Sequence, residues 1–232
     1  FPTMSVPWER EPSVGRCLRR FDVIDGNEHV KILVTGVAGF IGHHAAMAML
    51  ERGDQVLGVD SMNAYYDPAL KAARLARLEA MPGFEFRQLD LSDRSVLETL
   101  GNAGIDRIVH LAAQAGVRHS IDEPLDYLDS NLAATLVVLE LARAVESSHL
   151  VFASSSSVYG LNEMMPFATG HPVDHPLSLY AATKRSAELM AHGYARLYGI
   201  PTTGLRFFSV YGTWGRPDMA LWKFAESIRE GR

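Results

Sequence analysis

The stretch VKILVTGVAGFIG, residues 30–42, decides the fold of this chain. Its first six residues form a short apolar run typical of a buried β-strand, and Gly36, Gly39 and Gly42 follow directly. Residues 41–52, rich in Ala, Met and Leu, then predict a helix. Glycines here let the backbone turn tightly and approach a pyrophosphate, and the third lets helix and strand pack closely. The helix N-terminus offers free N–H groups to the phosphates. Taken alone, the three glycines also fit a plain tight turn.

An acidic residue ends the next apolar run. QVLGVD, residues 55–60, predicts a second strand ending in Asp60, 18 residues after Gly42. A carboxylate here accepts hydrogen bonds from a ribose diol and repels a 2′-phosphate. No Arg occurs at positions 61–63 to bind such a phosphate. The pattern favours NAD over NADP as cofactor, and a strand-end carboxylate without a ligand is the simpler alternative.

Apolar runs and helical segments alternate from Val30 onward. Strands are predicted at residues 30–35, 55–60, 84–90, 106–113, 149–155 and 200–208, and helices at 41–52, 68–81, 93–100, 122–146 and 178–198. Alternation of this length implies a parallel sheet with helices on both faces. Continuously apolar strands agree, because parallel strands are buried on both sides. The predicted fold class is α/β, a doubly wound parallel sheet forming a Rossmann-like NAD-binding domain over residues 30–232.

Composition excludes several functional classes. The 232 residues are 47% hydrophobic and carry a formal net charge of −5, so no basic field indicates nucleic acid. Cys17 is the single cysteine, which rules out an intramolecular disulfide and fits a reducing compartment. No apolar run approaches the roughly 20 residues that span a bilayer. We therefore expect a cytoplasmic protein without membrane partners, and the sequence predicts no metal site.

Residues 1–29 differ from the rest in having three prolines, scattered charges and no periodicity. We interpret them as disordered or as a flanking extension. One alternative is a regulatory arm. Another is that Val30 is a misread start codon and the upstream residues are translated flanking DNA, because a strand begins there with no lead-in.

The helix predicted over residues 178–198 contains Tyr180 and Lys184 four residues apart. Positions i and i+4 share one helix face, so phenol and ammonium point the same way. A nearby ammonium is expected to lower the pKa of the tyrosine and so to favour proton abstraction from a hydroxyl. An isolated YxxxK match is more simply an exposed helix face.

Four serines end the fifth predicted strand. SSSSVYG, residues 154–160, lies where open α/β sheets bind ligands, outside the carboxyl ends of the strands. Their hydroxyls can bind a sugar hydroxyl or a carboxylate. The simpler interpretation is a polar loop whose serines satisfy their own backbone, and it must hold for some of the four.

Together these motifs resemble the extended short-chain dehydrogenase/reductase superfamily, the NAD-dependent epimerases and dehydratases. The resemblance covers Val30 to the C-terminus. Within that superfamily the chain is most similar to UDP-glucuronate 4-epimerases. The stretches that carry this similarity are HLAAQAGVRHS (110–120), FASSSSVYG (152–160), residues 176–212 and WGRPDMALWKF (214–224).

The resemblance implies a role for each matching residue. Tyr180 matches the catalytic base, Ser155 the catalytic Ser/Thr, and Lys184 the partner of the base that also binds the nicotinamide ribose. The implied cofactor-binding set adds Gly36, Gly39, Phe40, Ile41, Gly42, Asp60, Asp90, Leu91, Leu111, Ala112 and Ala113. The implied substrate-binding set is Ser156, Ser157, Ser209, Arg216 and, less specifically, Arg118, for which a surface salt bridge is an equal alternative.

The implied reaction converts UDP-glucuronate to UDP-galacturonate through a 4-keto intermediate. A 4,6-dehydratase typically carries Asp-Glu where this chain has Ser156 and Ser157, and a UDP-glucuronate decarboxylase carries Glu at the second position. A UDP-galactose 4-epimerase, the nearest alternative, usually has Asn in place of Ser209. Thr213 departs from the Pro usual in the subfamily. From a different class, a non-catalytic NAD-sensing protein is disfavoured by the intact Ser155, Tyr180 and Lys184.

The resemblance also bears on how much of the enzyme is present. Members of that group continue beyond the equivalent of Arg232 with a last strand and a substrate-binding lobe. We therefore expect that lobe, which would start near residue 209, to be largely missing. An inactive NAD-binding fragment is thus a second alternative. The resemblance further implies a homodimer formed through the helices near 125–145 and 178–198.

Overall fold

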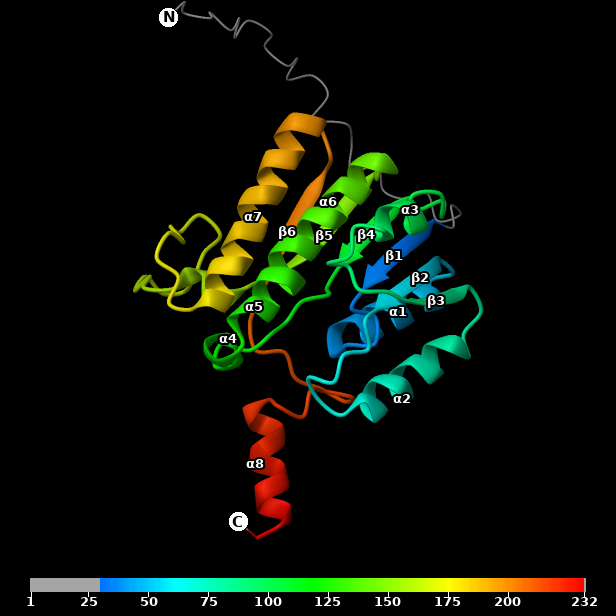
Figure 1. Ribbon diagram of the computed structural model, residues 1–232. Helices are drawn as coiled ribbons and strands as arrows, with labels where there is room; N and C mark the ends of the chain where they lie inside the picture. The colour runs from blue at the N-terminus through cyan, green and yellow to red at the C-terminus, as the bar shows by residue number, and fades with distance from the viewer. Residues whose placement is uncertain (1–29, 232) are drawn as a thin grey trace, which may run out of the picture.

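The computed structural model describes residues 30–231. A single sheet of six parallel strands forms its centre, in the order β3-β2-β1-β4-β5-β6 (Figure 1). The strands are β1 (Lys31–Thr35), β2 (Gln55–Asp60), β3 (Phe84–Gln88), β4 (Arg107–His110), β5 (His149–Ser155) and β6 (Thr202–Phe207). The predicted doubly wound parallel sheet is confirmed. The interpretation of residues 1–29 lies outside the described residues.

Helices cover both faces of the sheet. On one face, α1 (Phe40–Glu51) and α2 (Pro68–Glu79) pack against Ile32, Val34 and Val56. On the other, α3 (Val96–Leu100), α6 (Ala134–Ala144) and α7 (Leu179–Tyr198) pack against a cluster that includes Leu33 and Ile108. Alternate β1 residues thus enter two different cores, as the two-residue period of a strand requires. This explains the continuous apolar run with which the described chain begins.

The range 122–146, predicted to contain a long helix, holds α6 (Ala134–Ala144) in its second half and is interrupted in its first half. A short helix, α4 (His119–Asp122), ends before Glu123, which has the non-helical angles φ −126° and ψ 69°. Pro124 then begins α5 (Pro124–Tyr127), followed by a π-helical segment (Leu128–Ala133) and α6. The break follows from Pro124, because the proline ring disfavours α geometry in the preceding residue. The π-helical segment rotates the following residues relative to a regular helix.

The last described element, α8 (Ala220–Arg229), was not predicted. None of its residues is buried, and Leu221, Trp222, Phe224 and Ile228 are exposed. In Figure 1 it projects away from the sheet (red). Its amphipathic pattern is typical of a helix whose apolar side packs on other structure.

None of the described helices is both long and apolar enough to span a membrane. The cytoplasmic location expected from composition stays a prediction.

Candidate functional site

A cavity of about 640 Å³ opens at the carboxyl ends of the strands. It lies where the strand order reverses between β1 and β4, the position at which ligands bind in doubly wound sheets. The cavity is lined by every predicted site residue: Gly36, Gly39, Phe40, Ile41, Gly42, Asp60, Asp90, Leu91, Leu111, Ala112, Ala113, Arg118, Ser155, Ser156, Ser157, Tyr180, Lys184, Ser209 and Arg216. The fold therefore brings these residues to one place, and the role of each remains a prediction.

The glycine turn is built by close backbone approach. Gly36 has φ +69°, and a Cβ there would lie 2.7 Å from the Ala112 nitrogen. A Cβ on Gly39 would lie 2.9 Å from the Gly36 oxygen, and a Cβ on Gly42 would collide with that same oxygen. Gly39, the N-cap of α1, has no side chain and so makes no side-chain capping hydrogen bond. The turn is therefore a cradle that side chains would fill and that fits a diphosphate.

Asp60 is held at the cavity wall by backbone amides. Its two carboxylate oxygens accept hydrogen bonds from the Ala38 nitrogen, at 3.1 Å, and the Met62 nitrogen, at 2.9 Å. The simpler, structural interpretation of this carboxylate therefore holds in part. Lys71 lies 3.8 Å from Asp60 and donates a 2.7 Å hydrogen bond to Asn63. Sequence reasoning missed this cation because it considered positions 61–63 and not the first turn of α2.

At the opposite wall, α7 presents Tyr180 and Lys184 next to the end of β5. Lys184 is buried, and its Nζ donates a 2.9 Å hydrogen bond to the Ala153 carbonyl. Burial lowers the pKa of Lys184 to about 8. The ammonium thus remains the main form at neutral pH, with its charge directed toward the strand.

The expected lowering of the Tyr180 pKa is wrong for the protein without ligand. Burial raises the pKa of Tyr180, while the Ser155 hydroxyl and the Arg216 charge act in the opposite direction. Lys184 is not among the groups that shift the Tyr180 pKa, and its Nζ donates to the Ala153 carbonyl. Spacing along a helix predicted a shared face, but tertiary packing decided where the ammonium points.

The serines at residues 154–157 have divided roles. Ser154 donates a 2.6 Å hydrogen bond to Glu188. The Ser155 hydroxyl accepts a 3.2 Å hydrogen bond from the Ser157 nitrogen, which begins a 3₁₀ turn (Ser156–Tyr159). The prediction that some of these serines satisfy their own backbone is confirmed for Ser155, whereas Ser154 bonds to a side chain of α7. Ser155 lines the cavity in addition.

The two arginines proposed for the substrate differ in setting. Arg216 is partly buried and pairs with Asp218, with its Nε 3.0 Å from the carboxylate. Tyr65 also donates to Asp218, at 3.3 Å. Arg118 is exposed at the cavity margin and forms no ion pair with any of the described residues, so the surface salt bridge is not found. Ser209 is likewise exposed at the margin.

Asp90, one of the residues implied for cofactor binding, bonds to its own turn. Its Oδ1 accepts hydrogen bonds from the Ser92 nitrogen, at 2.9 Å, and from the Ser92 hydroxyl, at 2.8 Å. This carboxylate therefore stabilises the turn after β3. Leu91 beside it is buried, and both residues line the cavity.

A polar layer beneath the cavity was not found from the sequence. Thr35 lies 2.8 Å from the Nδ1 of His110 and accepts hydrogen bonds from the Leu111 and Ala112 nitrogens, both at 3.2 Å. In the π-helical segment, Asn131 accepts from the Gln114 nitrogen at 2.8 Å and donates to the Gln114 carbonyl at 3.0 Å. Such layers fix the strand ends that carry the site. Their members lie far apart in sequence, so no local pattern marks them.

The Gln114 side chain in this layer has a buried hydrogen-bond donor without a partner. Its Nε2 is buried with no hydrogen-bond partner in the structure, and the residue lines the cavity. A buried donor without a partner is costly and calls for a ligand or water.

No group of three or more His, Cys, Asp or Glu residues within residues 30–231 is arranged to hold a metal ion.

Comparisons with known proteins agree with this geometry. A model of the NAD dependent epimerase/dehydratase family matches residues 32–232. A probable UDP-glucuronate 4-epimerase of Rhizobium meliloti (strain 1021) is 51% identical over 204 residues, which are 88% of this chain and 60% of that protein. UDP-glucuronate 4-epimerase 1 of Arabidopsis thaliana is 43% identical over 229 residues, 98% of this chain and 52% of that protein.

A solved structure matches as well. The UDP-glucuronic acid 4-epimerase from Bacillus cereus, in complex with UDP-glucuronic acid and NAD, superposes with a TM-score of 0.81 and 35% sequence identity. The match covers 88% of this chain and 64% of that one. The chain spans about 60% of the length of several curated relatives that it matches.

The glycine cradle can be tested by adding one methyl group. Gly42→Ala places a Cβ against the Gly36 carbonyl, so the turn must shift. We expect NAD affinity, measured by isothermal titration calorimetry, to fall at least ~10-fold, because about 1.4 kcal/mol of strain or lost contact is enough. Gly193→Ala is the matched control, since a Cβ there meets open space on α7. Equal NAD affinity of the two variants would contradict the cradle.

The His110 environment predicts a pH dependence of stability. Burial lowers the pKa of His110 to about 3, and Lys184 adds to the shift. The folded-state pKa lies below the unfolded value of about 6.5, so the unfolded chain binds the extra proton. His110 therefore leaves stability unchanged above pH ~6.5 and reduces it by up to about 1.4 kcal/mol per pH unit below that.

Urea unfolding at pH 7, 5 and 4 measures this effect. We expect His110→Gln to be less stable than the natural chain at pH 7 but to lose less stability on acidification. His192→Gln, at an exposed position of α7, should keep the natural pH slope. If His110→Gln shows the same slope as His192→Gln, His110 is not held neutral by burial.

Proposed function

The chain belongs to the NAD-dependent epimerase/dehydratase family, and we propose that it binds NAD as part of an enzyme that epimerises UDP-glucuronate at C4. One observation carries this proposal. Ser155 from β5, Tyr180 and Lys184 from α7 and the glycine turn after β1 line the same cavity. Relatives named as UDP-glucuronate 4-epimerases support the same substrate.

The glycine turn and Asp60 would hold the two ends of the cofactor's nucleotide half. The turn offers backbone amides to the diphosphate, and Asp60 offers a carboxylate to a ribose diol. Lys71 beside Asp60 partly balances its charge, because the two groups lie 3.8 Å apart. When bound, NAD⁺ would accept hydride from the sugar carbon C4 and return it to the opposite face, ending unchanged.

We propose that Tyr180 takes the proton of the C4 hydroxyl and later returns it. Burial raises its pKa in the free protein, so this base needs positive charge nearby. The Arg216 charge acts in that direction, and Lys184, mainly protonated at pH 7 with a pKa of about 8, would bind the nicotinamide ribose beside Tyr180. Ser155, at the strand end beside Tyr180, would orient the hydroxyl during the transfer.

The substrate assignment follows from the chemistry of the residues near Ser155. Ser156 and Ser157 line the cavity where a dehydratase needs added acidic groups. Hydroxyls and the Arg216 guanidinium suit a uronate carboxylate and a diphosphate. The same residues are compatible with a neutral hexose, so UDP-galactose is included in the test.

The experiment uses the full-length gene product with UDP-glucuronate, followed by NMR. We expect UDP-galacturonate. UDP-xylose with release of carbon dioxide would identify a decarboxylase, and turnover of UDP-galactose alone would identify a hexose epimerase. Tyr180→Phe should reduce turnover by about 10²- to 10⁴-fold, the usual contribution of a general base, and leave NAD affinity intact. Tyr198→Phe, on the same helix outside the cavity, is the control.

We also propose that α5, α6 and α7 form a homodimer interface. Supporting this, Leu125, Leu136 and Leu189 are exposed on these helices, and Leu128 is exposed on the π-helical segment between α5 and α6. Leu125 is 71% exposed and Leu189 56%, which is typical of a surface that packs on a partner.

Sedimentation equilibrium of the full-length protein should give twice the chain mass. Leu189→Glu should give the monomer mass and Leu161→Glu, in an exposed loop, should not; identical masses for both variants would contradict the interface.

A further inference from the structure

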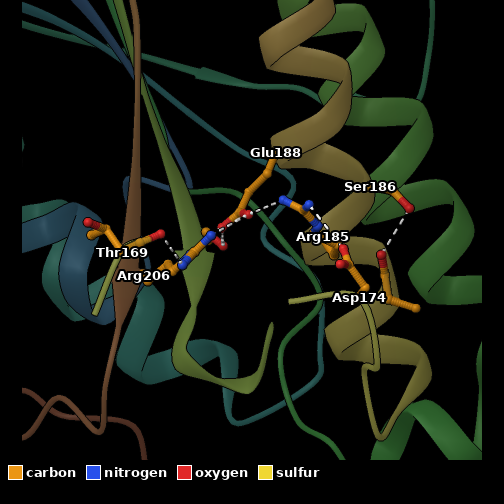
Figure 2. Close-up of polar contacts among 8 residues, drawn as sticks. Thr169, Asp174, Arg185, Ser186, Glu188 and Arg206 are labelled. Atoms are coloured by element: carbon orange, nitrogen blue, oxygen red, sulfur yellow. Dashed lines mark hydrogen bonds and ion pairs between the residues drawn. The ribbon is translucent and has the colours of Figure 1, made fainter. Parts of the chain in front are cut away.

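Glu188 lies on α7 one helical turn after Lys184. Tyr180, Lys184 and Glu188 are four residues apart, so all three occupy one face of the helix. Figure 2 shows the Glu188 side chain reaching from the helix toward Arg206, with Arg185 on its other side. No local sequence motif marks Glu188.

The carboxylate of Glu188 joins three elements of the fold. Arg206, on β6, donates to it through Nε at 2.8 Å and Nη2 at 3.0 Å, a two-bond fork that fixes orientation as well as distance. Arg185 donates a third hydrogen bond at 3.0 Å. Ser154, which pairs with Arg206 in the sheet register, donates a fourth at 2.6 Å. Burial raises the pKa of Glu188, but the hydrogen bonds outweigh it and the net pKa is lowered.

Three consecutive residues at the end of β5 each meet this face of α7. The Ala153 carbonyl accepts from Lys184 at 2.9 Å, and the Ser154 hydroxyl donates to Glu188. Ser155, the next residue, lines the same cavity as Tyr180, and its hydroxyl acts to lower the Tyr180 pKa. The strand and helix are thus joined by hydrogen bonds at two successive residues, directly before the serine with a proposed catalytic role. The Glu188 contact is the one that also reaches the next strand, β6.

We propose that Glu188 is a positioning residue, which sets Ser155 against Tyr180 by fixing Ser154. This inference rests on the proposed function. Arg206 would serve as the support that keeps the Glu188 carboxylate oriented. Displacements of the reacting groups by about 1 Å can cost ~10²-fold in rate, so a single hydrogen bond next to the catalytic serine is sufficient to matter.

The Ser154→Ala variant distinguishes a positioning role of Glu188 from a purely structural one, because only a positioning role predicts a lower kcat. This change removes the hydrogen bond between β5 and Glu188 but leaves the Arg206 and Arg185 contacts in place. We expect kcat of the full-length enzyme to fall ~10- to 100-fold, with KM for UDP-glucuronate and NAD affinity within ~2-fold. Glu188→Gln should act in the same direction. If Glu188→Gln fails to fold, Ser154→Ala alone decides.

The matched control is Glu140→Gln. Glu140, on α6, accepts hydrogen bonds from Tyr194 and Arg143, so the change removes a comparable carboxylate away from the cavity. Its kcat should match that of the natural enzyme. An unchanged kcat in Ser154→Ala, or an equal loss in Glu140→Gln, would overturn the inference.

A second measurement does not depend on turnover. ¹⁵N NMR can follow the Lys184 ammonium of the full-length protein in the NAD complex, with Lys184→Met assigning the signal. A displaced end of β5 weakens the contact with Ala153 and admits water, which should raise the Lys184 pKa from about 8. We expect this in Ser154→Ala and not in Glu140→Gln.

The two measurements separate the inference from the proposed function. A natural enzyme without epimerase activity refutes the proposed function, and the Lys184 titration then decides the role of Glu188. An unchanged Lys184 pKa in Ser154→Ala would in that case show that the strand end does not depend on this contact.

Discussion

The close approach of α1 to the end of β1 is the constraint on which the site depends. A side chain at Gly36, Gly39 or Gly42 would fill the space in which the backbone turns. Because the helix starts so near the strand end, its N-terminus faces the carboxyl edge of the sheet, where β4 and β5 also end. The other predicted site residues line the cavity that opens at this edge.

Buried polar groups hold the neighbouring strand ends in place. Arg74, fully buried, donates to the Ala38 carbonyl at 3.0 Å and to the Trp214 carbonyl at 2.7 Å, and so joins the glycine turn to the segment that carries Arg216. Thr35 and His110 connect β1 to β4 in a similar way. Burial that fixes these groups also shifts their chemistry, as the lowered pKa values of His110 and Lys184 show.

The two walls of the cavity differ in how their chemistry arises. The wall formed by Gly36, Gly39 and Gly42 has its shape because these residues carry no side chains. The spacing of the three glycines can be recognised in the local sequence. The α7 wall works through charge and hydrogen bonding among α7, β5 and β6, which depends on how three elements pack. Arg206 and Ser154 are 52 positions apart yet adjacent in the sheet, and Glu188 contacts both.

The sequence by itself determined the parallel α/β sheet and the glycine turn, and its resemblance to a known family implied the set of residues that meet at the cavity. The sheet and the turn follow from short-range rules, since strand and helix periods and the position of a residue at a strand end are readable locally. Tertiary structure alone decided the break at Glu123, the exposed α8, Lys71 beside Asp60, and the Glu188 network. It also reversed the expected direction of the Tyr180 pKa. The physical reason is that burial and the direction of a long side chain depend on contacts between segments distant in the chain, which no local spacing encodes.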